Sequence, residues 1–166
     1  MEFPRERRTQ RLRLRALAWD DAEVFREIHL DPRTHVHTPA GPPDADQVAG
    51  MFAGIVGVWE DQGSSYWAVG LDENVIGVCG VEAQPILERE CWNLYYRLSP
   101  ETWGRGFASE AAREAVVVAG LVAPNRPVVA RTRSSNLPSM RVAERAGLVR
   151  RAALDHDGFV VLATEW

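Results

Sequence analysis

Two glycines separate a strand-like segment from a helix-like segment in the middle of the chain. Residues 92–98 are aromatic and aliphatic, as in a half-buried strand, and Pro100 ends that strand because proline cannot donate a ladder hydrogen bond. Residues 108–120 are rich in alanine and place apolar side chains at helical spacing. Gly104 and Gly106, between them, allow the backbone to turn its N–H groups towards an anion at the helix N-terminus. The pattern is typical of a pyrophosphate site, although an ordinary tight turn would use the same glycines.

The sequence of this loop matches neither of two common phosphate-binding motifs. No Gly-Lys-Ser/Thr follows, and the third glycine of a dinucleotide fingerprint is missing. The segment Trp103-Gly104-Arg105-Gly106-Phe107-Ala108 resembles the acyl-CoA loop of the GNAT N-acetyltransferases, Gln/Arg-x-x-Gly-x-Gly/Ala. Trp103 replaces the usual first residue, as is common in the branch that resembles the ribosomal-protein N-terminal acetyltransferases (RimJ/RimL-like).

A second segment carries the same resemblance. Residues 136–148 are similar to the family's Asn-x-x-Ser helix, which ends in Gly-Phe, with Leu148 in place of the phenylalanine. The order of strand, glycine loop, helix, strand and Asn-x-x-Ser helix also matches the family. The resemblance covers the whole chain and is most specific over residues 94–148.

The hydrophobic pattern and this resemblance imply one α/β (α+β) acetyltransferase domain over residues 1–166. Its expected fold is a GNAT-like mixed, mostly antiparallel central sheet of about seven strands, with helices on both faces. The pattern predicts strands and helices at regular intervals. The strands are expected at residues 10–17, 65–71, 74–81, 90–98, 128–132, 149–154 and 159–166, and the helices at residues 20–31, 44–60, 108–120 and 136–146. Residues 1–9 are rich in arginine and are expected to form a flexible tail.

Composition narrows the classes of function. The 19 basic residues other than histidine are all arginine; residues 126–151 hold seven of them, whereas residues 16–125 hold 17 carboxylates. A pI of about 5.6 argues against a nucleic-acid partner, so the basic segment fits a phosphorylated cofactor better. The acidic segment favours a cationic amine acceptor, although a carboxylate-rich surface is usually just solvated.

The sequence also bears on the cellular location and on possible membrane, metal and subunit partners. No apolar run approaches the roughly 20 residues that span a bilayer, and the N-terminus has no apolar signal core, so we expect a cytoplasmic protein without a membrane partner. Cys79 and Cys91 lie in strand-like apolar segments, which favours packing over a disulfide or a metal site. No metal is expected, and dimers are common in the resembled family, which makes a homodimer compatible with the sequence.

The resemblance implies that acetyl-CoA is the co-substrate. Its pyrophosphate would bind the glycine loop, and its pantetheine arm would follow the end of the preceding strand, where the family splays two parallel strands apart and leaves main-chain donors free. The implied cofactor-binding residues are Tyr96, Arg97, Leu98, Trp103, Gly104, Arg105, Gly106, Phe107, Ala108, Ser109, Asn136 and Ser139. Asn136 could alternatively serve only as a helix N-cap.

The catalytic candidates are Ser139, Glu90 and Glu82. Many relatives use a tyrosine four residues after this serine as the acid that protonates the departing thiolate, but this chain has Ala143 there. Ser139, or a water, would therefore have to donate to the thiolate. Glu90 and Glu82 are the carboxylates nearest to the position of a glutamate base in several relatives, which Trp92 occupies here. His35, His37 and Trp92 are the candidates for binding the acceptor, and either histidine could also be an exposed loop residue without a role.

The predicted function is N-acetyl transfer from acetyl-CoA to a primary amine, by direct attack on the thioester. The acceptor could be a small molecule or a peptide N-terminus. Two alternatives stay open on the sequence: a non-catalytic acyl-CoA sensor, which the missing glutamate and tyrosine would explain, and a protein that binds RNA or a nucleotide through the arginines of residues 126–151.

Overall fold

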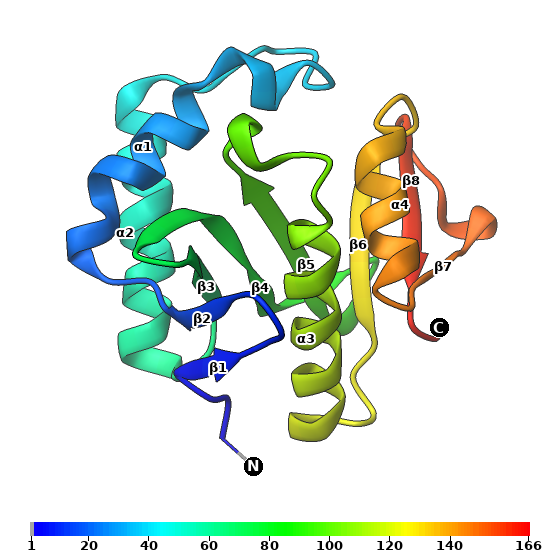
Figure 1. Cartoon of the computed structure of the whole chain (residues 1–166). Helices are drawn as coiled ribbons and strands as arrows, with labels where there is room; N and C mark the ends of the chain where they lie inside the picture. The colour runs from blue at the N-terminus through cyan, green and yellow to red at the C-terminus, as the bar shows by residue number, and fades with distance from the viewer. Residues whose placement is uncertain (1) are drawn as a thin grey trace.

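The computed structural model describes residues 2–166, which form one mixed sheet with four α-helices (Figure 1). The strands are β1 (Glu6–Arg8), β2 (Arg13–Ala16), β3 (Tyr66–Leu71), β4 (Asn74–Ile86), β5 (Arg89–Leu98), β6 (Val128–Arg133), β7 (Val149–Arg150) and β8 (Phe159–Ala163). The helices are α1 (Ala22–Leu30), α2 (Ala45–Gln62), α3 (Phe107–Val122) and α4 (Leu137–Arg145), with 3-10 turns η1 (Trp19–Asp21), η2 (Pro32–His35), η3 (Pro100–Thr102) and η4 (Ala152–Leu154).

The sheet has eight strands in the order β1-β2-β3-β4-β5-β6-β8-β7. Only β5 and β6 pair in parallel, and every other neighbouring pair is antiparallel. The mixed, mostly antiparallel sheet with helices on both faces is therefore confirmed. The eighth strand is β1, which the sequence pattern did not indicate.

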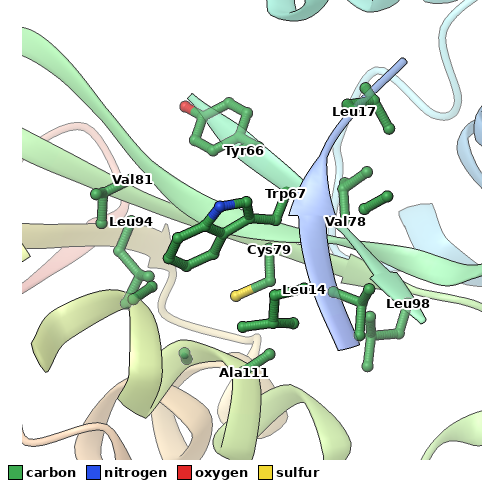
Figure 2. Close-up of a cluster of buried hydrophobic side chains, with 14 of the residues drawn as sticks. Leu14, Leu17, Tyr66, Trp67, Val78, Cys79, Val81, Leu94, Leu98 and Ala111 are labelled. Atoms are coloured by element: carbon green, nitrogen blue, oxygen red, sulfur yellow. The ribbon is translucent and has the colours of Figure 1, made fainter. Parts of the chain in front are cut away.

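The two faces of the sheet bury different helices. Directly paired residues of neighbouring strands share a face, so Trp67, Cys79 and Tyr96 lie together on the face that α3 covers. Figure 2 shows Trp67 and Cys79 pointing towards Ala111 of α3, while Tyr66 points to the opposite side. We call these the α3 face and the α1 face, because the ring of His29 in α1 stacks on Tyr95, which shares its face with Tyr66.

The N-terminal segment is ordered, although the sequence predicted a flexible tail. Residues 6–8 pair with β2 as strand β1, and Phe3 is buried between three indole rings, those of Trp59, Trp67 and Trp92. The indole N–H of Trp67 also donates to the carbonyl of Pro4 at 3.0 Å. Burial of one aromatic ring therefore orders a segment whose arginines otherwise suggest a solvated chain.

The C-terminal hairpin agrees with the sequence pattern and refines it. The predicted final hairpin is formed by β7 and β8, but β7 is short and the chain then turns through η4. Cys79 and Cys91 are free and buried. Within residues 2–166, no helix is both long and apolar enough to cross a membrane, and no cluster of three His, Cys, Asp or Glu side chains could hold a metal ion.

Candidate active site

The two parallel strands separate after a short stretch of pairing. In the described chain, β5 pairs with β6 only at Trp92 with Val128 and Asn93 with Val129, and Figure 1 shows the strands diverging beyond these pairs. The N–H of Trp92 donates to Pro127 at 2.8 Å on the β6 side, so by alternation Leu94, Tyr96 and Leu98 also turn their N–H groups to that side. The N–H of Leu94 still belongs to the paired stretch, whereas Tyr96 and Leu98 lie beyond it and face no strand. The sheet therefore offers an edge for an extended, amide-bearing ligand.

A cavity of about 540 Å³ lies at this divergence. The residues that line it come from η2, the end of β5, the glycine loop, the first turn of α3 and the helix α4. They are Arg33, Thr34, Val36, His37, Tyr96, Arg97, Leu98, Thr102, Trp103, Gly104, Gly106, Phe107, Ala108, Ser109, Asn136, Pro138, Ser139, Arg141, Val142 and Arg145. Because Tyr96 and Arg97 are on opposite faces of the sheet, the cavity is bordered by residues of both faces.

The N-terminus of α3 is the uncapped helix end at this cavity. Gly106 is its N-cap residue with φ at +81°, and no side chain accepts from the first turn. By contrast, Asp44 caps α2 and Asn136 caps α4 through side-chain hydrogen bonds. The free N–H groups at the start of α3, together with the positive end of its dipole, are the donors that a bound anion requires. Phosphate binding at this helix end stays a prediction that the geometry allows.

The N-terminal strand region holds the glycine loop in place. Glu110 in the first turn of α3 accepts from the backbone N–H of Arg11 at 2.8 Å and from its Nε at 2.7 Å. The guanidinium of Arg11 also donates to the carbonyl of Arg105 at 2.9 Å. These contacts link the residues between β1 and β2 to both ends of the loop.

Asn136 and Ser139 lie at the start of α4, on the opposite wall. The Oδ1 atom of Asn136 accepts from the N–H of Ser139 at 3.2 Å, so the N-cap alternative for Asn136 is realised. This cap does not use the amide nitrogen of Asn136, which has no hydrogen bond within residues 2–166, and Asn136 still lines the cavity. The capping bond therefore orients the amide and leaves its donor for a ligand.

Tyr96 connects β5 with α4. Its hydroxyl donates to the carbonyl of Ser139 at 2.7 Å and lies 3.0 Å from the Oγ atom of the same residue. Burial raises the pKa of Tyr96 to about 12, so the phenol stays protonated at neutral pH. No local pattern in the sequence indicates this contact, because it joins residues 43 positions apart.

A directed hydrogen-bond chain supports the α1 face of the cavity. Arg97 donates from Nε to the hydroxyl of Tyr95 at 2.8 Å, and this hydroxyl lies 3.0 Å from Nε2 of His29. Nδ1 of His29 lies 2.8 Å from the carbonyl of Phe25, which can only accept, so the proton is on Nδ1 and Nε2 accepts from Tyr95. Burial lowers the pKa of His29 to about 4, which keeps the ring neutral.

His35 and His37, the two histidines proposed to bind the acceptor, occupy different environments. His37 lines the cavity, whereas His35 is buried and does not. Nε2 of His35 donates to the carbonyl of His29 at 2.8 Å, and burial lowers the pKa of the His35 ring. The expectation of an exposed loop histidine at position 35 is therefore wrong, because the turn η2 packs beneath α1.

Three further predicted residues lie outside the cavity. Trp92 is buried against Phe3 with the guanidinium of Arg126 over its ring, so it is a core residue and not an acceptor contact. Arg105 stacks on Phe107 at 4.8 Å from the ring centre and is not among the lining residues. Glu90 is largely exposed near the beginning of β5, about 20 Å along the strand from Tyr96, where its nearest cation is Arg126.

Glu82 occupies an intermediate position. It pairs in register with Asn93, the last β5 residue that contacts β6, and its side chain accepts from the hydroxyl of Ser65 at 2.9 Å. The carboxylate lies on the α1 face, half-buried, but it does not line the cavity. Among the predicted carboxylates, Glu82 is the one near the base of the strand divergence.

The charge of the cavity differs from the sequence expectation. Its lining residues within the described chain include four arginines, Arg33, Arg97, Arg141 and Arg145, and no carboxylate. Arg33 is neutralised by Asp31 and Glu101, at 2.6 and 2.7 Å. The acidic segment of the sequence is therefore not gathered around the cavity, and an acidic amine-binding cleft is not what the fold forms. Thr34, Val36, Thr102, Pro138 and Val142 also line the cavity without having been predicted, because the sequence gives no local signal for them.

Comparison with known proteins decides the family. The family model described as an acetyltransferase (GNAT) domain matches residues 11–149. The chain belongs to the GNAT acetyltransferase family.

Solved structures share this fold over nearly the whole chain. An acetyltransferase from Agrobacterium tumefaciens is 26% identical, with a TM-score of 0.84 over 100% of this chain and 96% of its own. An acetyltransferase from Salmonella typhimurium that modifies the N-terminal serine of ribosomal protein L7/L12 is 16% identical, with a TM-score of 0.73 over 98% of each chain. RimL, a ribosomal L7/L12 α-N-protein acetyltransferase in complex with coenzyme A, is also 16% identical, with a TM-score of 0.74 over 98% of this chain and 97% of its own.

GNAT enzymes use acetyl-CoA as co-substrate, and this acetyltransferase has the features that such a ligand requires. The uncapped N-terminus of α3 fits a pyrophosphate, and the unpaired N–H groups of β5 fit an arm that contains amides. Arg141 and Arg145 face the same cavity from α4 and have no carboxylate partner within residues 2–166, so they can neutralise phosphate charge. The residues present therefore fit acetyl-CoA in polarity and charge.

Proposed function

We propose that this acetyltransferase transfers the acetyl group of acetyl-CoA to a primary amine by direct attack. One observation carries the proposal: the cavity is bordered by residues from both faces of the sheet where β5 and β6 diverge. A donor held along the glycine loop and α4 on one face can therefore meet an acceptor that arrives from the α1 face. Orientation of the two reactants in this way is a large source of rate enhancement.

Main-chain donors supply the electrophilic assistance in this proposal. The N–H of Tyr96 lies on the unpaired edge of β5 and can hydrogen-bond to a thioester carbonyl, whose oxygen gains charge as the amine attacks. Ser139 lies across the divergence and can donate to the sulfur as the thiolate departs. Neither cysteine lines the cavity, and burial raises the pKa of the Cys79 thiol, which supports direct attack over transfer through a cysteine.

The amine must lose a proton during the reaction. We propose Glu82, acting through water, as the group that accepts it, because it is on the acceptor side near the base of the divergence. Glu90 is too remote to take this role. The proton could also leave directly to solvent, since the α1 face of β6 is open at Arg131.

A non-catalytic acyl-CoA sensor is the second candidate function. The absence of a carboxylate from the described cavity lining favours it, because a sensor needs the cofactor cradle but no base. The two functions differ in one property: a sensor binds acetyl-CoA without consuming it in the presence of any amine.

Two measurements in sequence test the proposal. Acetyl-CoA should raise the midpoint of thermal unfolding, and ATP at the same concentration should not, because a ligand that binds only the folded state stabilises it. The protein is then incubated with acetyl-CoA and a panel of peptides, amino acids, polyamines and aminoglycosides, with detection of free thiol and of acetylated amine. Thiol release that depends on an amine and is reduced in Ser139→Ala supports the proposal. Stabilisation by acetyl-CoA without acetylation of any amine favours the sensor.

A further inference from the structure

We propose that the acceptor is the N-terminal α-amine of an acidic peptide, whose carboxylates bind Arg131 and Arg133 on the α1 face of β6. This inference rests on the proposed N-acetyl transfer and names the acceptor for it. It reverses the expectation of a cationic acceptor, because the structure gathers arginines, and not carboxylates, at the place where an acceptor would enter.

The register of the sheet places these arginines on the acceptor side. Asn93 and Val129 are paired and share a face, so side chains two and four residues further along each strand lie on that same face. On β5 these are Tyr95 and Arg97, and on β6 they are Arg131 and Arg133. The pairing of Arg133 with Phe159 of β8 agrees, since the guanidinium lies 3.9 Å from the centre of that ring. Three arginines therefore border the divergence on one face.

None of these three arginines is neutralised by a carboxylate within residues 2–166. Arg97 uses its guanidinium to hold Tyr95 and Thr34, at 2.8 Å each, and Arg133 donates to the carbonyl of Asp157, also at 2.8 Å. Arg131 is exposed and makes no hydrogen bond among the described residues. Elsewhere on the surface, arginines such as Arg33 and Arg150 are paired with acids. Arg97, Arg131 and Arg133 therefore keep their charge uncompensated by an ion pair beside the divergence.

Two acidic residues lie near these arginines. Glu82 lies on the same face at the base of the divergence, where it accepts from Ser65, and Asp157 adjoins Arg133, which donates to its main-chain carbonyl. Three guanidinium groups against these two carboxylates leave the region with net positive charge. An ammonium with no anion of its own would be repelled on approach, whereas an amine that is followed by carboxylates would be attracted.

The same charges favour reaction of an α-amine over a lysine side chain. Nearby cations disfavour the ammonium form and so lower the pKa of a bound amine. An α-amine starts near a pKa of roughly 8, whereas a lysine amine starts at roughly 10, so the α-amine yields far more neutral nucleophile at physiological pH. A cavity lining without a carboxylate is consistent with such an acceptor, because the amine needs less help to lose its proton.

The position of the arginines indicates a chain longer than one amino acid. Arg131 and Arg133 do not line the cavity, so a group that binds them lies outside the space in which the amine must react. Their separation along β6 is about 7 Å, which equals the distance between alternate side chains of an extended peptide. A peptide that enters with its N-terminus and carries two acidic side chains at alternate positions can satisfy both sites together.

The test compares three hexapeptides with free N-termini that differ only at two alternate positions, occupied by glutamate, glutamine or lysine. We expect kcat/KM for the glutamate peptide to exceed that for the glutamine peptide by about 10-fold at low salt, and the advantage to shrink at high ionic strength. Arg131→Gln and the double variant with Arg133→Gln should remove most of this advantage and leave the glutamine peptide within about 2-fold. Arg8→Gln, in β1 at the other side of the sheet, is the matched control and should change neither value.

A binding measurement separates this inference from the proposed function. Fluorescence anisotropy of the N-acetylated glutamate peptide reports its affinity whether or not the protein is catalytic, and Arg131→Gln alone covers the case in which the double variant unfolds. Equal rates for the three peptides, a preference for lysine, or acetylation of free amino acids or polyamines alone would overturn the inference while N-acetyl transfer stands. If the protein binds acetyl-CoA but acetylates no amine, the proposed function is refuted instead. If the acetylated acidic peptide binds weakly and Arg131→Gln does not change its affinity, the inference itself is refuted.

Discussion

The hydroxyl of Tyr96 on β5 lies 3.0 Å from the hydroxyl of Ser139 on α4, across the divergence that forms the cavity. Tyr96 also donates to the Ser139 carbonyl, so its single proton is already committed to the helix backbone. Burial raises the pKa of Tyr96, which disfavours release of its proton, and its two contacts with Ser139 lead us to interpret it as the residue that positions Ser139.

Tyr96→Phe should therefore affect both binding and turnover. Loss of the tie between β5 and α4 should raise the KM for acetyl-CoA several-fold and lower kcat by about 10-fold, because Ser139 loses its partner. Ser139→Ala keeps the bond from Tyr96 to the carbonyl and should lower kcat with little change in KM. Steady-state kinetics of both variants with one amine acceptor make the comparison; a Tyr96→Phe enzyme with unchanged parameters would show that the contact has no role in the reaction.

Gly106→Ala should weaken binding of acetyl-CoA. The φ angle of +81° at Gly106 suits glycine, and an alanine there costs about 1 kcal/mol or turns the N–H groups of the first turn of α3 away from the phosphate. Gly63, with φ at +68° at the end of α2, is a matched control because Gly63→Ala introduces the same strain outside the cavity. We expect the affinity for acetyl-CoA to fall by roughly 10-fold or more in Gly106→Ala, because the phosphate donors are misplaced, and to stay unchanged in Gly63→Ala. Calorimetric titration with acetyl-CoA measures it, and equal affinities in the two variants would contradict the phosphate cradle.

Phe3→Ala should destabilise the fold even though it lies near the N-terminus. The ring is 6% exposed and lies 5.0 Å from that of Trp67, so its removal leaves a cavity among the indoles and should cost about 3 kcal/mol of unfolding free energy. Its neighbour Glu2 is exposed, and Glu2→Ala should change the stability by less than about 0.5 kcal/mol. Urea denaturation followed by tryptophan fluorescence measures the stability of both variants. If Phe3→Ala is as stable as Glu2→Ala, the N-terminal segment does not contribute to the core and the expectation of a flexible tail stands.

The parts of this structure that the sequence predicts are those set by local pattern. Gly104 and Gly106 mark a loop between an aromatic strand and an alanine-rich helix, and the resemblance of residues 136–148 to a family helix places the opposite wall. Each of these signals lies within about a dozen neighbouring residues. The end of β5, the glycine loop and the helices α3 and α4 follow from them.

The parts that the sequence does not predict depend on contacts between distant segments. Glu90 lies on the expected strand but at the wrong end of it, because the point at which β5 leaves β6 is set by the pairing of Asn93 with Val129. Phe3 is one apolar residue among arginines, and only the indoles from α2, β3 and β5 explain its burial. The positive charge of the cavity likewise arises from the meeting of η2, β5 and α4, which no charge count along the chain reveals.

His29 should make the stability depend on pH in the mildly acidic range. Its folded pKa of about 4 is below the unfolded value of 6.5, chiefly because of burial, so between these values the unfolded chain binds a proton that the folded chain does not. Stability from this residue is complete above pH 6.5 and is lost as the pH falls towards 4, by at most about 3 kcal/mol. His29→Gln should lower the stability at pH 7, because the hydrogen bonds to Phe25 and Tyr95 change, and should flatten the slope between pH 6.5 and 4. Urea midpoints of both proteins across that range provide the measurement. Parallel curves for wild type and His29→Gln would mean that His29 does not stay neutral in the fold, and the donor assignment from Tyr95 to His29 would then be wrong.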